Sequence, residues 1–126
     1  MTAAAKSKVA LVVDDEVFAR LFAIQILLDE GFTVLEAADA AEGLDVLERN
    51  DDVSVLFTDI SMPGEIDGLG LVRKVREQRP GVALLVTSGV VEPPRGAMPP
   101  GGRFLAKPYT AHALMSAIRE IEDVAL

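Results

Sequence analysis

The sequence predicts an α/β fold in which a doubly wound, five-stranded parallel sheet is covered by helices on both faces. Five short runs of β-branched and apolar residues alternate with stretches in which apolar residues recur at helical spacing. The strand-like runs are apolar on both faces, which is typical of strands inside a parallel sheet. The strand count favours the order 2-1-3-4-5 with right-handed crossovers. The predicted strands are residues 8–13, 32–37, 53–58, 82–87 and 103–106.

Four helices are expected between and after these strands, and most carry a start or stop signal. Gly31 is placed as a C-terminal cap of the first helix. Asp39 with Glu42 three residues later fits a capping box, and Asp67 and Thr110 precede two further helical segments. The apolar residues at helical spacing are Val17, Leu21, Ile24 and Leu28 in the first helix, Leu44 and Leu47 in the second, Leu69, Val72 and Val75 in the third, and Leu114, Ile118 and Ile121 in the last.

The connection between Ser88 and Lys107 departs from this alternation. It contains four prolines and several glycines, which argues against a full-length fourth helix. We expect one short turn of helix or an irregular loop there, within residues 89–102.

The sequence also predicts a flexible N-terminal tail, residues 1–7, and a single domain, residues 8–126.

The composition excludes several classes of function. No apolar run approaches the roughly 18–20 residues of a membrane helix, so we expect no membrane anchor. The lack of cysteine excludes disulfides and cysteine-ligated metals, and we expect the single histidine, His112, to face solvent. A net charge of −8 argues against binding to nucleic acid. Proteins and cations are the expected partners.

Three carboxylates are expected to converge at one edge of the sheet. In the order 2-1-3-4-5 the ligand crevice lies at the carboxyl ends of the first and third strands. The first strand leads into Asp14 and Asp15, and the third leads into Asp59. Two carboxylates about 4 Å apart repel by roughly 4 kcal/mol at an effective dielectric near 20. The cluster therefore needs a cation, and Mg²⁺ suits carboxylate oxygens best, with Mn²⁺ as the second choice.

A hydroxyl group and an ammonium group are expected at the same edge. The fourth strand ends near Ser88, and the fifth leads into Lys107 and Pro108. A carboxylate nucleophile beside a divalent ion, a hydroxyl and a lysine is suited to phosphoryl transfer, because the cations and donors stabilise charge on the phosphoryl oxygens.

These residues give the chain a resemblance to a response-regulator receiver domain of the stand-alone type, from about Lys8 to Ile121. The matching motifs are VVDDE (12–16), FTDISMPG (57–64), DGL (67–69), VTSG (86–89) and FLAKPY (104–109). Each motif alone is a weak signal, but all of them occur in the family's order and spacing. The resemblance implies the flavodoxin-like receiver fold.

The resemblance also implies a role for each polar residue of the site. Asp59 corresponds to the phosphoacceptor. Asp15 would hold Mg²⁺ directly and Asp14 largely through water, while the backbone carbonyl of Ser61 would complete the protein ligands.

Two further residues and one peptide bond are implied by the same resemblance. Ser88 and Lys107 would contact phosphoryl oxygens. Phe104 corresponds to the family's switch aromatic, which moves inward when the Ser88 hydroxyl is drawn to the phosphoryl group. The peptide bond between Lys107 and Pro108 corresponds to the family's cis peptide.

The implied function is a phosphorylation switch in the cytoplasm. It would accept a phosphoryl group from a histidine kinase or a phosphotransfer protein and catalyse its own phosphorylation and slow dephosphorylation. Because the sequence ends shortly after the last helix, we expect output through protein binding or phosphorelay rather than through an output domain. A monomer or a weak homodimer is expected.

Two departures from the family pattern concern the loop after Asp59 and the readout surface. The turn MPGEIDG has one residue more than the commonest pattern, so the third helix is expected to start later or the loop to bulge. The Pro/Gly-rich connection replaces a helix through which many receivers signal.

Other interpretations stay open at this point. Each site residue has an ordinary alternative, as a helix cap (Asp14 and Asp15), a turn residue (Asp59), a loop hydroxyl (Ser88), a surface lysine (Lys107) or core (Phe104). Phe18 and Phe22 are either core or a docking patch for a kinase or a second copy. The competing functions are a binding module that is never phosphorylated and a phosphohydrolase. The latter would need a second acid–base residue, for which Glu16 is the only spare carboxylate, and a cap domain.

Overall fold

The computed structural model describes residues 8–89, 92–94 and 96–125, and the predicted tail of residues 1–7 lies outside them. Within the described residues the chain forms five strands and four helices. In chain order the elements are β1 (Val9–Val13), α1 (Val17–Asp29), β2 (Thr33–Ala37), α2 (Ala40–Arg49), β3 (Val53–Asp59), α3 (Gly68–Gln78), β4 (Ala83–Ser88), β5 (Arg103–Ala106) and α4 (Ala111–Ala125).

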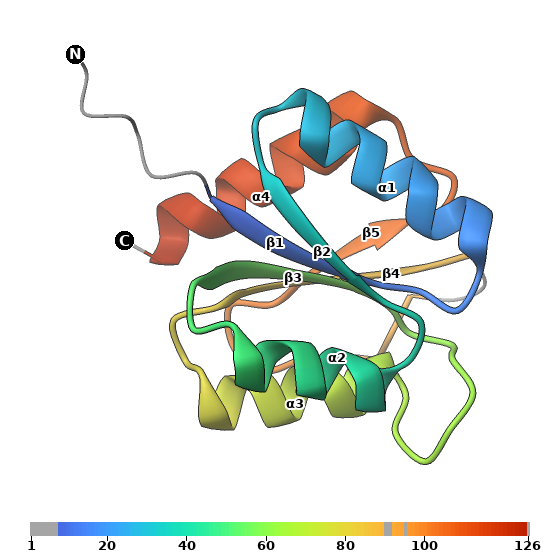
Figure 1. The fold of residues 1–126 in the computed structure, drawn as a ribbon, viewed down its shortest axis with the longest axis vertical. Helices are drawn as coiled ribbons and strands as arrows, with labels where there is room; N and C mark the ends of the chain where they lie inside the picture. The colour runs from blue at the N-terminus through green and yellow to red at the C-terminus, as the bar shows by residue number, and fades with distance from the viewer. Residues whose placement is uncertain (1–7, 90–91, 95, 126) are drawn as a thin grey trace.

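The predicted architecture is confirmed. All neighbouring strands are parallel, and their order is β2-β1-β3-β4-β5. Figure 1 shows the sheet between two layers of helices, with α1 and α4 on one face and α2 and α3 on the other. The predicted bounds of the first four strands are wrong by one residue at one or both ends, and β5 agrees. None of the described helices is long and apolar enough to cross a membrane.

The central strands are buried on both faces, which is why most of their residues are apolar. Every residue of β1 is buried, and its side chains alternate between two hydrophobic clusters. Leu11 and Val13 pack toward α2 and α3, while Ala10 and Val12 pack toward α1 and α4. This two-sided burial fixes the register of the strands, since a slip by one residue would exchange the two faces.

Side-chain caps begin three of the helices, as the sequence predicts. Asp39 accepts a hydrogen bond from the Glu42 amide at 2.8 Å, and Glu42 in turn accepts one from the Ala38 amide at 2.7 Å. Asp67 caps α3 through the Gly70 amide at 2.9 Å. Thr110 Oγ1 accepts from the Ala113 amide at 3.0 Å at the start of α4. Each cap satisfies an amide that the helix itself leaves unpaired.

The apolar residues at helical spacing in α1 do not all lie on its buried face, although Ile24 is partly buried and packs against the core. The buried residues of α1 are Ala23, Ile26 and Leu27. Val17 and Leu21 are about half exposed, at 52% and 49%. The reason is that α1 is apolar around most of its circumference, so that helical spacing alone cannot select the face that meets the sheet.

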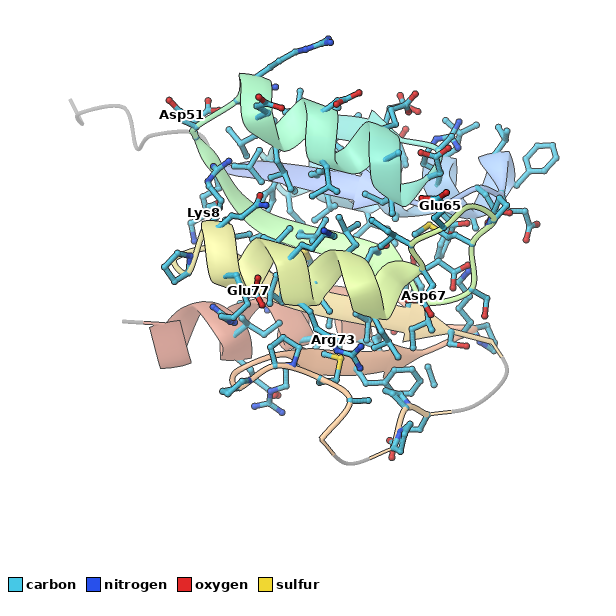
Figure 2. The ribbon with its side chains drawn as sticks, turned by 90° about the horizontal axis from the view of Figure 1, so that it is seen from below. Lys8, Asp51, Glu65, Asp67, Arg73 and Glu77 are labelled. Carbon is cyan, nitrogen blue, oxygen red and sulfur yellow. The ribbon has the colours of Figure 1, made fainter. Side chains whose placement is uncertain are left out.

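The β4–β5 connection forms no helix in residues 92–94 and 96–102, as the prolines predict. Its second half is nevertheless anchored to α3. Arg73 donates from Nε and Nη2 to the carbonyl of Ala97, at 3.2 and 3.0 Å, and Met98 packs against the core on the α2–α3 side. Figure 2 shows Arg73 on the side of α3 that faces this connection.

The loop that follows β3 returns to the end of that strand through a close backbone contact. The Gly68 amide donates to the carbonyl of Ile60 at 2.9 Å, and α3 starts at Gly68, directly after the Asp67 cap. The additional residue is therefore accommodated within residues 60–67 rather than by a later helix start; Figure 2 shows Glu65 in this loop and Asp67 at its end. A Cβ atom at position 68 would overlap the carbonyl oxygen of Asp59.

Gly68→Ala is expected to destabilise the protein by about 2 kcal/mol or more, because the added methyl group must displace backbone rather than a flexible side chain. Urea unfolding checks this, with Gly81→Ala as the matched control. Nothing lies within 4 Å of a Cβ at Gly81, so the control should be neutral or stabilising by up to about 1 kcal/mol. Equal stability of the two variants would contradict the prediction.

Candidate functional site

The carboxyl ends of β1 and β3 bring the predicted acidic residues together. Val13 pairs with Thr58, so Asp14 follows β1 beside the point where Asp59 ends β3. On the other side Asp59 pairs with Thr87 of β4. Because the strands are parallel and adjacent, their ends open at the same edge of the sheet.

Asp14, Asp15 and Asp59 form one acid cluster. A carboxylate oxygen from each of the three lies within 4.8 Å of the others. Asp14 and Asp59 are buried, at 4% and 9% exposure, whereas Asp15 is exposed. Asp14 and Asp15 do not cap α1 in the way that Asp39 caps α2, since the N-cap position belongs to Glu16. The Asp14 carboxylate instead accepts from the Glu16 amide at 2.9 Å, which holds the loop between β1 and α1.

Lys107 joins the cluster from the end of β5. Its Nζ lies 3.2 Å from Asp14 Oδ2 and 3.3 Å from Asp59 Oδ2. The Lys107 amide donates to the Ser88 carbonyl at 3.0 Å, and the following peptide bond to Pro108 is cis, the conformation that the resemblance implies. Burial opposes the charge on Lys107, but attraction to Asp14 and Asp59 outweighs it and raises the pKa of the lysine. Lys107 thus contacts two of the three carboxylates, and the cluster contains more acidic than basic side chains.

The surroundings of Asp59 disfavour its ionised form. Burial, followed by repulsion from Asp14, raises the pKa of Asp59, although Lys107 and a hydrogen bond from the Ser61 amide work in the opposite direction. The Ser61 amide donates to Asp59 Oδ1 at 3.3 Å. Asp59 therefore retains an unbalanced cost of ionisation that a further cation would relieve.

The remaining predicted residues lie on neighbouring strands. Ser88 is buried and ends β4, and Phe104 is partly buried on β5, where it packs against the core on the α2–α3 side. Their switching roles, and the coordination by the Ser61 carbonyl, stay predictions. His112 is exposed on α4, as expected.

Two contacts of the site were not predicted from the sequence. Arg20 of α1 reaches back to the carbonyl of Asp14, with Nη1 at 2.7 Å. Tyr109 packs between the rings of Phe22 and Phe57, with ring centroids 5.5 and 5.7 Å apart. Burial and the neighbouring negative charges raise the pKa of its hydroxyl group. No local motif marks Arg20, whereas Tyr109 is the last residue of the motif FLAKPY, in which no role was predicted for that position.

The donor set of the acid cluster fits a hard divalent cation. Carboxylate oxygens are the ligands that Mg²⁺ and Mn²⁺ prefer, and Mg²⁺ typically binds one or two carboxylates together with waters and phosphate oxygens. The exposed side chain of Asp15 leaves the cluster open to solvent on one side. Asp14, Asp15 and Asp59 are thus the residues that could hold such an ion.

The fold and the site define a class of protein: a doubly wound α/β domain with an acid cluster at the strand ends and a lysine directly after the last strand. Comparison with known proteins identifies the family within that class. The chain belongs to the response regulator receiver domain family, whose model matches residues 10–119.

Relatives of known name agree with this assignment. A chemotaxis protein CheY homolog of Campylobacter jejuni is 34% identical over 117 residues, which cover 88% of this chain and 89% of the relative. Sensor kinase CckA of Brucella abortus is 31% identical over 91% of this chain, but the chain spans only 12% of that kinase.

Solved structures show the same fold. The receiver domain of the hybrid histidine kinase CckA superposes with a TM-score of 0.78 at 32% identity, covering 90% of this chain and 98% of that one. A response regulator receiver protein of Sinorhizobium medicae has a TM-score of 0.89 over 96% of this chain and 98% of the other, and at 24% identity it supports the fold alone.

Asp59→Asn is expected to stabilise the metal-free protein at neutral pH, because the substitution removes a carboxylate whose ionisation is opposed by burial and by Asp14. Asp59 binds its proton more tightly in the folded state than in the unfolded state, so ionisation at neutral pH costs stability. As the pH falls through the folded pKa the wild type recovers this cost, and the difference between the proteins disappears below about pH 3.9, the unfolded value.

Urea unfolding in the presence of a chelator, at several pH values, measures this difference. Asp45→Asn removes the same charge from the exposed face of α2 and should change stability by less than about 0.5 kcal/mol. An Asp59→Asn protein less stable than the wild type at neutral pH would contradict the prediction.

Proposed function

We propose that the chain is a signalling switch that accepts a phosphoryl group on Asp59, with Mg²⁺ bound at the acid cluster, from a histidine kinase or a phosphotransfer protein. The observation that carries the proposal is the convergence of Asp14, Asp15 and Asp59 on one point, with Lys107 in contact with two of them. Membership of the receiver family supports it. We place the reaction in the cytoplasm.

The chemistry follows from the side chains present. A carboxylate oxygen of Asp59 attacks the phosphorus of a phosphohistidine, the P–N bond breaks, and its electron pair stays on the imidazole nitrogen. When bound, Mg²⁺ supplies positive charge to the phosphoryl oxygens, and Mn²⁺ is the second choice. Lys107, which already lies beside Asp59 Oδ2, pairs with a phosphoryl oxygen. Attack of water on the aspartyl phosphate later returns inorganic phosphate, so the domain catalyses both its phosphorylation and its dephosphorylation.

The positions of the other ligands and of the switch belong to the same proposal. Asp15 would hold the ion directly, Asp14 would hold it largely through water, and the Ser61 carbonyl would complete the protein ligands. The Ser88 hydroxyl bonds a phosphoryl oxygen, and Phe104 then moves further inward. Support comes from the strand-end position of Ser88 and from the partial burial of Phe104.

Acetyl phosphate or beryllofluoride with Mg²⁺ should shift the amide NMR signals around Asp59 in the wild type, and acetyl phosphate should add the mass of one phosphoryl group. Asp59→Asn should show neither change, and a chelator should abolish both in the wild type. Asp45→Asn, with the same loss of charge on α2, should behave as the wild type does. A wild type unaffected by either reagent would sink the proposal in favour of a receiver-shaped binding module.

An apolar surface beside the site supports a protein as the phosphodonor. Phe18 is 82% exposed and Phe22 is 50% exposed, so neither is fully core. Both line a hollow that is also lined by Lys107, Pro108 and Tyr109, and Lys107 contacts the acid cluster. A partner that covers this surface would lie close to Asp59, as a phosphohistidine donor must. Output by protein binding or by phosphorelay completes the proposal, and a monomer or weak homodimer is expected.

Phe18→Ala should lower kcat/KM for phosphotransfer from a histidine kinase or phosphotransfer protein that phosphorylates the wild type, by about tenfold, equivalent to roughly 1.4 kcal/mol. Phosphorylation by acetyl phosphate should be unchanged, since the small donor does not need the apolar surface. Leu28→Ala, near the other end of α1 and 48% exposed, is the control and should leave both reactions unchanged. Equal losses with both donors would argue against a docking role.

A further inference from the structure

Arg20 connects three parts of the fold at the edge of the acid cluster. Its guanidinium group donates from Nη1 to the carbonyl oxygen of Asp14 at 2.7 Å and from Nε to Oε1 of Glu36 at 2.8 Å. The side chain of Arg20 is only 15% exposed, whereas that of Glu36 is 54% exposed. Arg20 belongs to the second turn of α1, and Glu36 is the penultimate residue of β2. The arginine thus ties the helix and the neighbouring strand to the loop between β1 and α1.

The carbonyl that Arg20 holds belongs to the peptide group between Asp14 and Asp15. Both of these residues contribute a carboxylate to the acid cluster. On the other side of Asp14, its amide donates to the carbonyl of Ala37 at 3.1 Å. The two peptide groups that flank Asp14 are therefore both held, one by β2 and the other by Arg20. Rotation of the second peptide group would turn the Asp14 and Asp15 side chains relative to Asp59.

We propose that Arg20 is a positioning residue for the divalent-cation site, oriented by Glu36, and this inference rests on the proposed binding of Mg²⁺. Arg20 does not touch the phosphoryl group or the ion; it fixes the backbone from which Asp14 and Asp15 extend. A hydrogen bond from a charged guanidinium to a carbonyl is stronger than one between neutral groups, so it is suited to hold a loop that carries repelling carboxylates.

The charge of Arg20 allows a decisive test, because loss of its charge and loss of its hold on the loop would change Mg²⁺ affinity in opposite directions. A positive group near the acid cluster repels a divalent cation. If charge were its only contribution, removal of Arg20 would tighten Mg²⁺ binding. If Arg20 positions the loop, removal weakens binding, as loss of residues that orient metal ligands does.

The experiment compares Arg20→Gln with the wild type by isothermal titration with MgCl₂, and we expect about tenfold weaker binding, within the range for residues that orient ligands. Arg119→Gln is the matched control. Arg119 Nη2 lies 3.7 Å from Oε1 of Glu30, the residue that follows the C-terminal end of α1. Arg119→Gln therefore removes the same charge as Arg20→Gln and also breaks a surface ion pair. The control should bind Mg²⁺ as the wild type does. Unchanged or tighter binding by Arg20→Gln would overturn the inference.

The variant Arg20→Lys distinguishes the two-sided hydrogen bonding of the guanidinium group from its positive charge. Lysine keeps the positive charge but has no planar fork to hold the Asp14 carbonyl and Glu36 together. We expect its Mg²⁺ affinity to fall between those of the wild type and Arg20→Gln. Wild-type affinity in this variant would show that a single charged donor is enough and would overturn the orienting role given to Glu36.

Amide hydrogen exchange of the metal-free proteins provides a readout that needs no bound ion. Exchange at residues 14–16 should be faster in Arg20→Gln than in the wild type and unchanged in Arg119→Gln, while exchange in the central strands stays the same. Equal rates in Arg20→Gln and the wild type would count against the inference. A wild type that binds no Mg²⁺ would overturn the proposed function, and the exchange rates would still decide whether Arg20 holds the loop.

Discussion

Repulsion among carboxylates at the end of a parallel sheet is the constraint around which this domain is arranged. Asp14 and Asp59 are held at the end of the sheet by strands that are buried on both faces, so the side chains cannot move apart without disturbing the core. Lys107 relieves part of the repulsion by contacting both. The repulsion that remains would be relieved by a further positive charge.

The backbone around the cluster is held as firmly as the side chains. Gly68 lets the loop after β3 return onto the carbonyl of Asp59, where any side chain would clash. Arg20 and Ala37 hold the peptide groups on the two sides of Asp14. The unfavourable charge arrangement is thus supported by hydrogen bonds and packing from α1, β2 and α3, which is how a reactive geometry can persist in a folded protein.

Much of this arrangement could be predicted from the sequence because it depends on strand ends. Once the order of five parallel strands is assumed, the residues that follow each strand must meet at one edge, and this places Asp14, Asp59, Ser88 and Lys107 together. The helix caps are equally local, since a cap and its amide are separated by only three residues. In each case the strand order or the short separation in sequence allows only one arrangement of the residues.

The parts that could not be predicted depend on contacts between elements. The buried face of α1 is set by how the chain leaves β1, and a helix that is apolar nearly all round gives no sign of it. The contact of Arg20 with Asp14 requires both that helix orientation and the register that brings Glu36 beside the end of β1. The position of Tyr109 between Phe22 and Phe57 likewise joins three separate elements.

The outward-facing aromatic and aliphatic side chains of α1 have a consequence for how the molecule behaves in concentrated solution. At neutral pH each copy carries a formal charge of −8, and the repulsion between copies opposes contact between these apolar helix faces. Near the isoelectric point of about 4.5 that protection vanishes. Colloidal solubility of the domain is therefore expected to be lowest in mild acid, where the exposed apolar side chains of α1 meet the least charge repulsion.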